Sequence, residues 1–252
     1  MIDAQTRDSY DAFAYAYDRA LGERFHQAIR KLVGETLQRY PTPRRTHLDV
    51  ACGTGLGVAL FRDLGFRSFG VDGSMSMLQV ARRRALAVAA GDFRALPLRG
   101  TFARITCFYD SLNHLKDRHQ LVAAFRAIRR LMDGGSLFLF DMNHPDVYPE
   151  VWGMKAPFVA GSADYHLEIS TTFNKRDRLA RALVTGWADL PAAGRVAIRE
   201  RHVQRAYSER EIVQSLGDAG LAAAEVLDLD PFGEVEMLGV QGVKFFFVCK
   251  AA

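Results

Sequence analysis

The chain has 252 residues, 49% of them hydrophobic, which is enough to bury a full core as a single globular unit. No run approaches the roughly 20 apolar residues that span a bilayer, and residues 1–5 show no basic stretch followed by an apolar one, so we expect a cytoplasmic protein without a membrane partner. The formal charge of +4 comes from arginines dispersed among acids, with no basic arm or aromatic platform, so no specific nucleic-acid partner is expected.

Three cysteines are scattered along the chain, at Cys52, Cys107 and Cys249. They lie in predicted strands or in a glycine-rich turn. An odd and dispersed set fits reduced thiols, and neither a disulfide framework nor a zinc site, so no metal is expected.

An amphipathic helical segment is predicted over residues 5–39. Apolar side chains recur there at helical spacing, at Phe13, Tyr17, Leu21, Phe25 and Ile29. The prolines at positions 41 and 43 end the segment. The stretch from Tyr10 to Asp18 is unusually rich in aromatic residues.

From Thr46 to Asp141 short apolar strands alternate with helices. Such alternation predicts a parallel sheet with helices on both faces, and the apolar strands fit a sheet that is covered on both sides. The fold class is therefore α/β, with a doubly wound, mostly parallel sheet.

The rhythm changes after about His144. Residues 163–170 and 179–188 are predicted as two strands joined by a polar turn at residues 174–177, and residues 196–207 as a third. We interpret them as a small antiparallel sheet inserted into the alternating fold. A helix then begins at Ser208, which is a predicted N-cap with Glu211 placed for a capping box, and two strands follow at residues 223–229 and 244–250.

The most informative segment runs from Thr46 through Gly57. A buried strand leads into a turn with glycines at positions 53, 55 and 57, and a helix follows whose free N–H groups face a ligand. A second strand, residues 67–71, ends on Asp72, where a carboxylate accepts hydrogen bonds from ribose hydroxyls. Together they indicate a nucleoside-binding crossover unit.

Two residues argue against a dinucleotide as its ligand. Val58 stands where a third glycine or alanine is expected, and the carboxylate of Asp49, just ahead of the turn, would face a pyrophosphate unfavourably. The same carboxylate suits a ligand with an ammonium group and a sulfonium. The favoured cofactor is therefore S-adenosyl-L-methionine, which leaves as S-adenosyl-L-homocysteine.

The segment D-x-A-C-G-T-G at residues 49–55 resembles the first motif of the class I S-adenosylmethionine-dependent methyltransferases, and further motifs follow in the family's order. They lie at residues 72–78, 90–98, 102–115 and 132–141. One departure is Asp133, where family members usually carry proline before two glycines. The resemblance covers Tyr10 to Lys250 and implies seven strands in the main sheet, the last of them antiparallel.

The resemblance also implies which residues bind the cofactor. Asp72 would hold the ribose, Asp92 would lie near the adenine amine, and Tyr17 would close over the methionine end. For Met77 and Phe93 plain core packing remains an alternative. The full predicted set is Tyr17, Asp49, Ala51, Gly53, Gly55, Asp72, Gly73, Met77, Asp92, Phe93 and Tyr109.

The sequence assigns no catalytic residue. Methyl transfer is a direct displacement on a sulfonium, so alignment supplies roughly 7–11 kcal/mol at best, and a general base adds about 10²–10⁴-fold. A dedicated base is therefore optional. The candidates are Tyr109 and His114 after the fourth strand and His202 on the inserted sheet, with a structural role as the alternative for each histidine.

Within the class the chain looks most like small-molecule enzymes such as glycine N-methyltransferase and the amino-sugar N,N-dimethyltransferases, so a small-molecule acceptor, favoured to be an amine, is expected. The implied organisation is an N-terminal helical and cofactor-binding part over residues 1–144, an inserted substrate lid over 145–205, and a C-terminal part over 206–252 that completes the core. Which atom accepts the methyl group and whether the chain forms a homo-oligomer are left open.

Two alternatives stand beside this interpretation. The pI near 9.0 favours an RNA methyltransferase, but residues 108–111 read Phe-Tyr-Asp-Ser where such enzymes carry an N-P-P-Y/F-type base pocket. The other alternative is a non-catalytic S-adenosylmethionine-binding partner protein, whose first motif would look the same.

Overall fold

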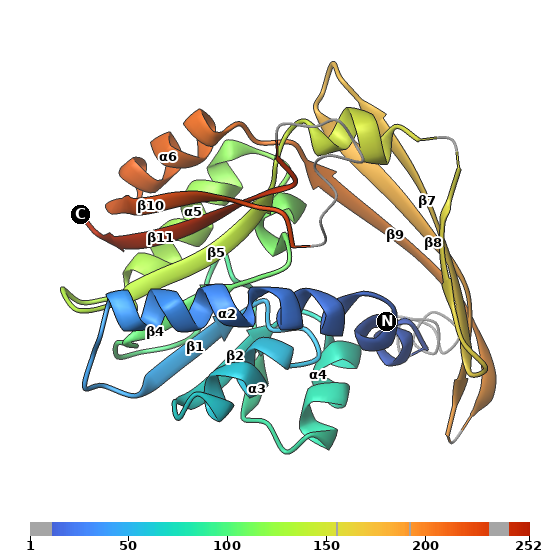
Figure 1. Cartoon of the computed structure of the whole chain (residues 1–252), viewed down its shortest axis with the longest axis horizontal. Coiled ribbons are helices and arrows are strands. Elements are labelled where there is room, and N and C mark those ends of the chain that lie inside the picture. The colour runs from blue at the N-terminus through green and yellow to red at the C-terminus, as the bar shows by residue number, and fades with distance from the viewer. Residues whose placement is uncertain (1–11, 155, 192, 232–241) are drawn as a thin grey trace.

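The computed structural model describes residues 12–154, 156–191, 193–231 and 242–252. Its strands form two sheets, a seven-stranded one and a four-stranded one that stands beside it (Figure 1). The strands of the larger sheet, in chain order, are β1 (Thr46–Val50), β2 (Arg67–Asp72), β3 (Val88–Ala90), β4 (Arg104–Cys107), β5 (Leu137–Asn143), β10 (Leu221–Leu229) and β11 (Lys244–Ala251). The α-helices are α2 (Glu23–Arg39), α3 (Leu56–Asp63), α4 (Met75–Arg83), α5 (Arg118–Arg129) and α6 (Glu209–Asp218).

The larger sheet has the order β10-β11-β5-β4-β1-β2-β3. β1 pairs in parallel with both β2 and β4, while β11 runs antiparallel to both of its neighbours, β5 and β10. The predicted fold class, a doubly wound sheet with an antiparallel last strand and an inserted antiparallel sheet, is confirmed. The strand order reverses between β1 and β4, and in such sheets ligands bind beyond the carboxyl ends of the strands at this point.

Helices cover both faces of the sheet, and alternate strand residues explain the division. Leu48 and Phe138 point to the face that α5 and α6 cover. Leu139 and Phe246 point to the opposite face, where Phe25 and Ile29 of α2 pack. Because successive strand side chains point to opposite sides, strands that are apolar throughout are needed to fill both layers.

The N-terminal segment is helical over residues 12–39 but is not a uniform α-helix, because residues Asp18–Gly22 form a π-helical turn, η1, before α2. Asp18 is buried in this turn, where it accepts hydrogen bonds from Thr54 and Arg84. Residues 5–11 of the predicted helix lie outside the described part of the chain. Short π segments are rare and often mark functional sites.

The smaller sheet contains four strands: β6 (Phe158–Gly161), β7 (Tyr165–Asn174), β8 (Leu179–Leu190) and β9 (Gly194–Arg205). All neighbours in it pair antiparallel. Three of these strands were predicted. β6 was missed because Phe158 and Val159 are exposed and the strand shows no alternation of apolar and polar residues.

One face of the smaller sheet is packed against the N-terminal segment. Side chains two residues apart along β7, β8 and β9 share this face with Phe13 and Ala16. The buried apolar residues of the sheet in this layer are Tyr165, Leu167, Val184, Ala188 and Ile198. The N-terminal helical segment therefore lies between the two sheets (Figure 1).

The predicted capping box at the start of α6 is confirmed. The amide of Glu211 donates to Oγ of Ser208 (3.3 Å), and the Ser208 amide donates to the Glu211 carboxylate (2.9 Å). This arrangement satisfies two of the N–H groups that a helix start leaves without partners. The helix therefore begins where the two residue types and their spacing place it.

A buried ammonium group links the ends of three strands. Nζ of Lys244, at the start of β11, donates to Asp110 (2.5 Å), Asp141 (3.0 Å) and Asn143 (2.8 Å). Burial disfavours the charge of Lys244, but the two carboxylates outweigh it and raise the pKa of this lysine. The carboxylate of Asp141 also accepts the amides of Tyr109 (2.5 Å) and Asp110 (3.0 Å).

The same network reaches the smaller sheet through Gln204 of β9. Its Nε2 donates to Asp110 (2.5 Å), and its Oε1 accepts hydrogen bonds from Asn143 (3.1 Å) and Tyr148 (3.0 Å). Asn113 adds a second link, because its Nδ2 donates to the carbonyl of Arg205 (2.9 Å). The two sheets are therefore joined by hydrogen bonds as well as by apolar packing.

Replacing the buried lysine tests how much the fold depends on this network. Lys244→Met keeps the length of the side chain but leaves the carboxylates of Asp110 and Asp141 without their cation. We expect the free energy of unfolding to fall by about 3–5 kcal/mol, because breaking a buried ion pair leaves an uncompensated charge. Urea unfolding measures the change.

The matched control is Lys250→Met, at the exposed end of the same strand, where the ammonium stands 4.6 Å from the centre of the Tyr40 ring. We expect that change to cost no more than about 1 kcal/mol. Equal losses in the two variants would show that the network contributes nothing beyond surface packing.

Candidate functional site

The turn between β1 and α3 is built from unusual backbone conformations. Ala51, Gly53 and Gly55 all have a positive φ, of 57°, 54° and 87°. A side chain at Gly55 would also collide with Leu86, whose Cδ1 would lie 2.4 Å from an added Cβ. The turn therefore needs glycine for both its conformation and its space, and it brings the backbone to the carboxyl end of β1.

The carboxylate of Asp49 lies against the start of α3. Its Oδ1 accepts a hydrogen bond from Thr106 (2.6 Å), and its carboxylate also accepts the backbone N–H of Val58. A Cβ on Gly57 would lie 2.3 Å from its Oδ2, so this glycine makes room for the carboxylate. The helix start that a dinucleotide's pyrophosphate would use already holds a negative side chain.

Burial governs the charge of this carboxylate. Asp49 is 3% exposed, and burial raises the pKa of Asp49 to about 7 despite the two hydrogen bonds that favour its ionised form. No lysine or arginine pairs with it in the part of the chain that the structure describes. A buried carboxylate without its own cation suits a positively charged ligand.

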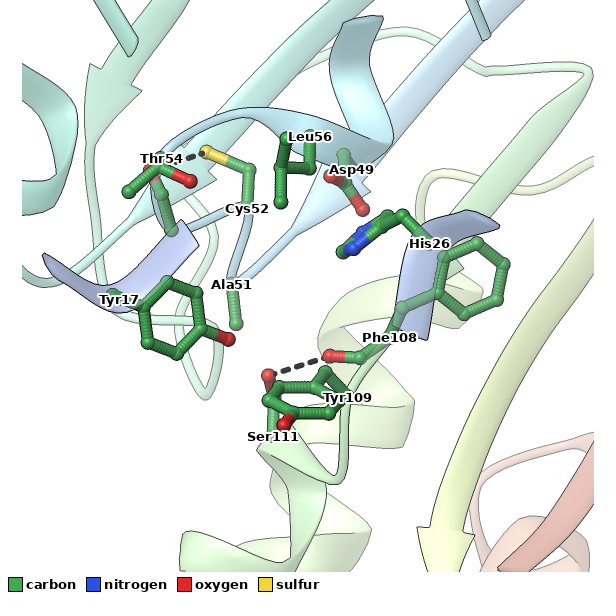
Figure 2. Close-up of a pocket in the computed structure, with 11 residues that line it drawn as sticks. Tyr17, His26, Asp49, Ala51, Cys52, Thr54, Leu56, Phe108, Tyr109 and Ser111 are labelled. Atoms are coloured by element: carbon green, nitrogen blue, oxygen red, sulfur yellow. Dashed lines mark hydrogen bonds between the residues drawn. The ribbon is translucent and has the colours of Figure 1, made fainter. Parts of the chain in front are cut away.

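A pocket opens beside this turn (Figure 2). It is lined from three directions: by the β1–α3 turn, by the N-terminal helical segment and by the residues that follow β4. The lining residues are Tyr17, His26, Asp49, Ala51, Cys52, Gly53, Thr54, Leu56, Phe108, Tyr109 and Ser111. Five of them, Tyr17, Asp49, Ala51, Gly53 and Tyr109, belong to the set that the sequence predicts.

The two tyrosines face each other across the pocket (Figure 2), with ring centres 6.0 Å apart. Tyr17 comes from the N-terminal segment, and Tyr109 follows β4. Tyr109 and Asp110 both have a positive φ, of 60° and 50°, which is costly for residues other than glycine. The carboxylate of Asp141 holds both amides and so fixes this strained turn.

Asp72 lies at the end of β2, next to the glycine turn. Its carboxylate accepts the amides of Gly53 (2.7 Å) and Ser74 (2.7 Å). Burial raises the pKa of Asp72, although these backbone hydrogen bonds oppose the change. Each carboxylate oxygen has a second lone pair that a ligand hydroxyl can use.

The remaining predicted cofactor residues do not line the pocket: Gly55, Asp72, Gly73, Met77, Asp92 and Phe93. Asp92 is exposed and ion-paired with Arg94 (2.5 Å), which lowers the pKa of Asp92. Phe93 packs partly buried against the main core, and Met77 packs against the layer around Phe13.

Sequence reasoning missed several lining residues, and His26 is the most informative of them. It lies on α2, where its Nδ1 contacts the carbonyl of Gly22 at 2.9 Å, and burial lowers the pKa of His26. Its spacing from Tyr17 gave no signal, because nine residues of regular α-helix place two side chains on opposite sides, and the π turn at residues 18–22 changes that phase. Thr54 is buried and bonded to Asp18, so the π turn and the glycine turn are fastened together.

The histidine candidates lie between the smaller sheet and the segment after β4. The rings of His114 and His202 are 5.9 Å apart, and the ring of Phe13 lies 5.5 Å from His202 and 5.8 Å from Tyr17. A continuous series of aromatic rings therefore leads from the pocket to β9. Tyr109, the third catalytic candidate, lines the pocket itself.

Two negative findings concern the described residues only. The structure shows no helix there with both the length and the apolar character that crossing a membrane requires. In the same residues no three histidine, cysteine, aspartate or glutamate side chains gather as they would around a metal ion.

Comparison with known proteins gives the same picture. Residues 48–135 match a family model described as a methyltransferase domain. A protein of Geobacillus sp. (strain WCH70) that is named as a methyltransferase is 36% identical over 143 residues, 54% of this chain and 58% of that protein. The dTDP-3-amino-3,6-dideoxy-alpha-D-glucopyranose N,N-dimethyltransferase of Streptomyces fradiae is 32% identical over 117 residues, 45% of this chain and 46% of that protein. Each alignment thus spans about half of the relative.

A solved structure extends the likeness in fold to nearly the whole chain. An S-adenosylmethionine-dependent methyltransferase from Clostridium acetobutylicum superposes with a TM-score of 0.78 at 23% identity, covering 95% of this chain and 98% of that one. The domain match, the ordered motifs and the fold agree. Residues 48–135 form a methyltransferase domain, and the chain resembles the class I S-adenosylmethionine-dependent methyltransferases in fold and the amino-sugar N-methyltransferases in sequence.

Proposed function

We propose that this methyltransferase transfers a methyl group from S-adenosylmethionine to the amine of a small molecule bound between the two sheets. The observation that carries the proposal is the pocket that Asp49, a buried carboxylate without a cation of its own among the described residues, lines together with Tyr17 and Tyr109. Such a site fits a ligand with a positive charge and an apolar flank. The cofactor supplies an activated methyl group on a sulfonium.

In this proposal the chain's own residues bind and orient. Asp49 would attract the positively charged methionine end, the backbone of Ala51 and Gly53 would border it, and Asp72 would accept the ribose hydroxyls. Tyr17 and Tyr109 would exclude water from the reacting centre. Positioning of this kind supplies much of the acceleration in a direct displacement.

An amine acceptor is supported by the curated relatives. The Streptomyces fradiae enzyme is named for N,N-dimethylation of a dTDP-amino sugar, and a Saccharopolyspora spinosa relative, 28% identical over 201 residues, is named for dTDP-4-amino-2,3,4,6-tetradeoxy-D-glucose. The aromatic rings between the pocket and β9 suit a cationic or apolar acceptor. The smaller sheet, within residues 145–205, would then cover the acceptor and select it.

Removing the ribose acceptor tests the cofactor site. Asp72→Ala should weaken S-adenosylhomocysteine binding by roughly 1–3 kcal/mol, because the ribose hydroxyls lose their partner. Titration calorimetry measures the loss, and Asp63→Ala, at the exposed end of α3, is the matched control. An unchanged dissociation constant in a folded Asp72→Ala protein would leave Asp72 as a turn residue only. The same titration on Asp92→Ala tests the adenine side. Weaker S-adenosylhomocysteine binding would mean that Asp92 gives up its ion pair with Arg94 to contact the adenine.

The charge of Asp49 predicts how cofactor affinity depends on pH. Burial raises the pKa of Asp49 to about 7 without ligand, and a bound cation favours the ionised form and so lowers that pKa. Affinity for S-adenosylhomocysteine should therefore rise with pH, by at most about tenfold per unit below 7, and level off above it. In Asp49→Asn the dependence should disappear and the affinity at pH 8 should fall. A pH-independent affinity in the unmodified protein would contradict this role.

The acceptor is tested by methyl transfer from labelled S-adenosylmethionine. We expect label on dTDP-3-amino-3,6-dideoxy-α-D-glucose or on another amine of low molecular weight in a cell extract. RNA is tested alongside as the alternative acceptor. Nucleic-acid affinity falls with salt at a log–log slope of about −0.9 per neutralised phosphate on duplexes, so non-specific RNA binding should disappear near physiological salt. Methylation of purified RNA that resists physiological salt, without a labelled small product, would favour an RNA methyltransferase instead. Cofactor binding with no labelled product of any kind would favour a non-catalytic protein.

A further inference from the structure

The inner face of the smaller sheet, which faces the N-terminal segment, is largely apolar, with Thr171 a polar exception on β7. On β9 the side chains of Glu200, His202 and Gln204 occupy alternate positions of this face. Opposite them on β8 lie Val184, Ala182 and Ala180, which are small and buried. Three polar side chains therefore stand in line on one strand of a largely apolar layer.

Only one of the three has its hydrogen bonds fully explained by the fold. Gln204 belongs to the buried network around Lys244. Glu200, with a side chain 3% exposed, has its Oε1 buried without a partner among the described residues, and Nε2 of His202 is likewise buried without an aligned one. Buried polar atoms without partners cost free energy, so their presence calls for an explanation.

Glu200 and His202 are in contact with each other. Nε2 of His202 lies 3.2 Å from Oε2 of Glu200. Burial raises the pKa of Glu200, and the contact with His202 partly opposes that change. The carboxylate lies close enough to favour a proton on Nε2, although the N–H is not aligned with it in the structure, and Nδ1, across the ring, is then left to accept a proton. Carboxylate and imidazole are paired in this way wherever a histidine must be held in one tautomer.

His202 is also the accessible member of the pair. Its side chain is 30% exposed while that of Glu200 is buried behind it. The rings of Phe13 and His114 flank it at 5.5 and 5.9 Å, and Phe13 leads on to Tyr17 in the pocket. His202 is thus partly exposed and belongs to the series of rings that leads to the pocket.

The other histidine is held differently. Nε2 of His114 lies 3.4 Å from Nε2 of Gln204, and His114 also bonds to the backbone of Val203. Burial lowers the pKa of His114, and the charge of Asp110 offsets only part of this change. His114 therefore contacts two residues of β9, Val203 and Gln204, while the polar contact of the His202 ring among the described residues is with the carboxylate of Glu200.

We infer that Glu200 is a positioning residue that holds His202 as the general base for the acceptor amine. The inference rests on the proposed function. The acceptor ammonium gives one proton to Nδ1 of His202, and Glu200 stabilises the imidazolium. The freed nitrogen lone pair then forms a bond to the methyl carbon as the carbon–sulfur bond breaks, its electron pair staying on sulfur in S-adenosylhomocysteine. His202 returns its proton to water.

The tautomer can be measured without any acceptor. We suggest nitrogen NMR of ¹⁵N-histidine-labelled protein loaded with S-adenosylhomocysteine at alkaline pH, where imidazoles are neutral, with His202→Gln used to assign the signal. We expect His202 to carry its proton on Nε2. A proton on Nδ1 would overturn the inference.

Kinetics provide the second test. Glu200→Gln keeps the shape but removes the charge, so kcat on dTDP-3-amino-3,6-dideoxy-α-D-glucose should fall by about 10²-fold, with the KM for S-adenosylmethionine unchanged. The 2-fluoro analogue carries a less basic amine that needs no base, so on it the variant should lose little. Asp189→Asn, a carboxylate of the same sheet that pairs with Arg195 at the surface, is the matched control and should behave as the unmodified protein.

The outcomes separate the two proposals. Equal loss on both sugars would make Glu200 a structural residue and overturn the inference while leaving the proposed function intact. Failure of the unmodified protein to methylate either sugar would count against the proposed acceptor, and the tautomer of His202 would then decide the role of Glu200 alone.

Discussion

One buried ammonium group, that of Lys244, holds together the parts of the site. It pairs with both Asp110 and Asp141, whose carboxylates would otherwise lie away from water without a cation. Asp141 can then fix the left-handed turn that carries Tyr109, and Asp110 can bind Gln204 of the smaller sheet. The pocket wall at Tyr109 and the position of the smaller sheet therefore depend on the same three charges.

Much of the fold follows from local patterns in the sequence. The glycine turn, the acids at the ends of β1 and β2, and the capping box at Ser208 each depend on residues close together in the chain. β6 and the π turn at Asp18 could not be predicted in this way. β6 is an exposed strand, so its apolar and polar residues do not alternate. The π turn adds a residue to a helical turn, which the spacing of apolar residues in the sequence does not reveal. The buried ion pairs around Lys244 also join residues more than 100 positions apart.

The two ends of the site differed in how well the sequence predicted them. The end proposed for the methionine part depends on backbone conformation and on one carboxylate, and both appear in a short motif around Asp49. The end proposed for the acceptor depends on which face of β9 points inward, and packing against Phe13 decides that. Glu200 was therefore overlooked in a strand where charged and apolar residues alternate incompletely. Asp92 was predicted as a cofactor residue from motif order, but in the structure it pairs with Arg94. The motif did not reveal this, because it takes no account of an arginine two residues away.

The alternation along β9 has a consequence for how such enzymes diversify. The smaller sheet is anchored to the core near the end of this strand, by Gln204 and by the carbonyl of Arg205. Ile198 and Glu200 are inward positions farther along it, six and four residues before Gln204. If the proposed function holds, substitutions there would alter the chemistry offered to an acceptor while the cofactor end stays as it is. Such a fold could exchange one substrate for another by a few changes on a single strand.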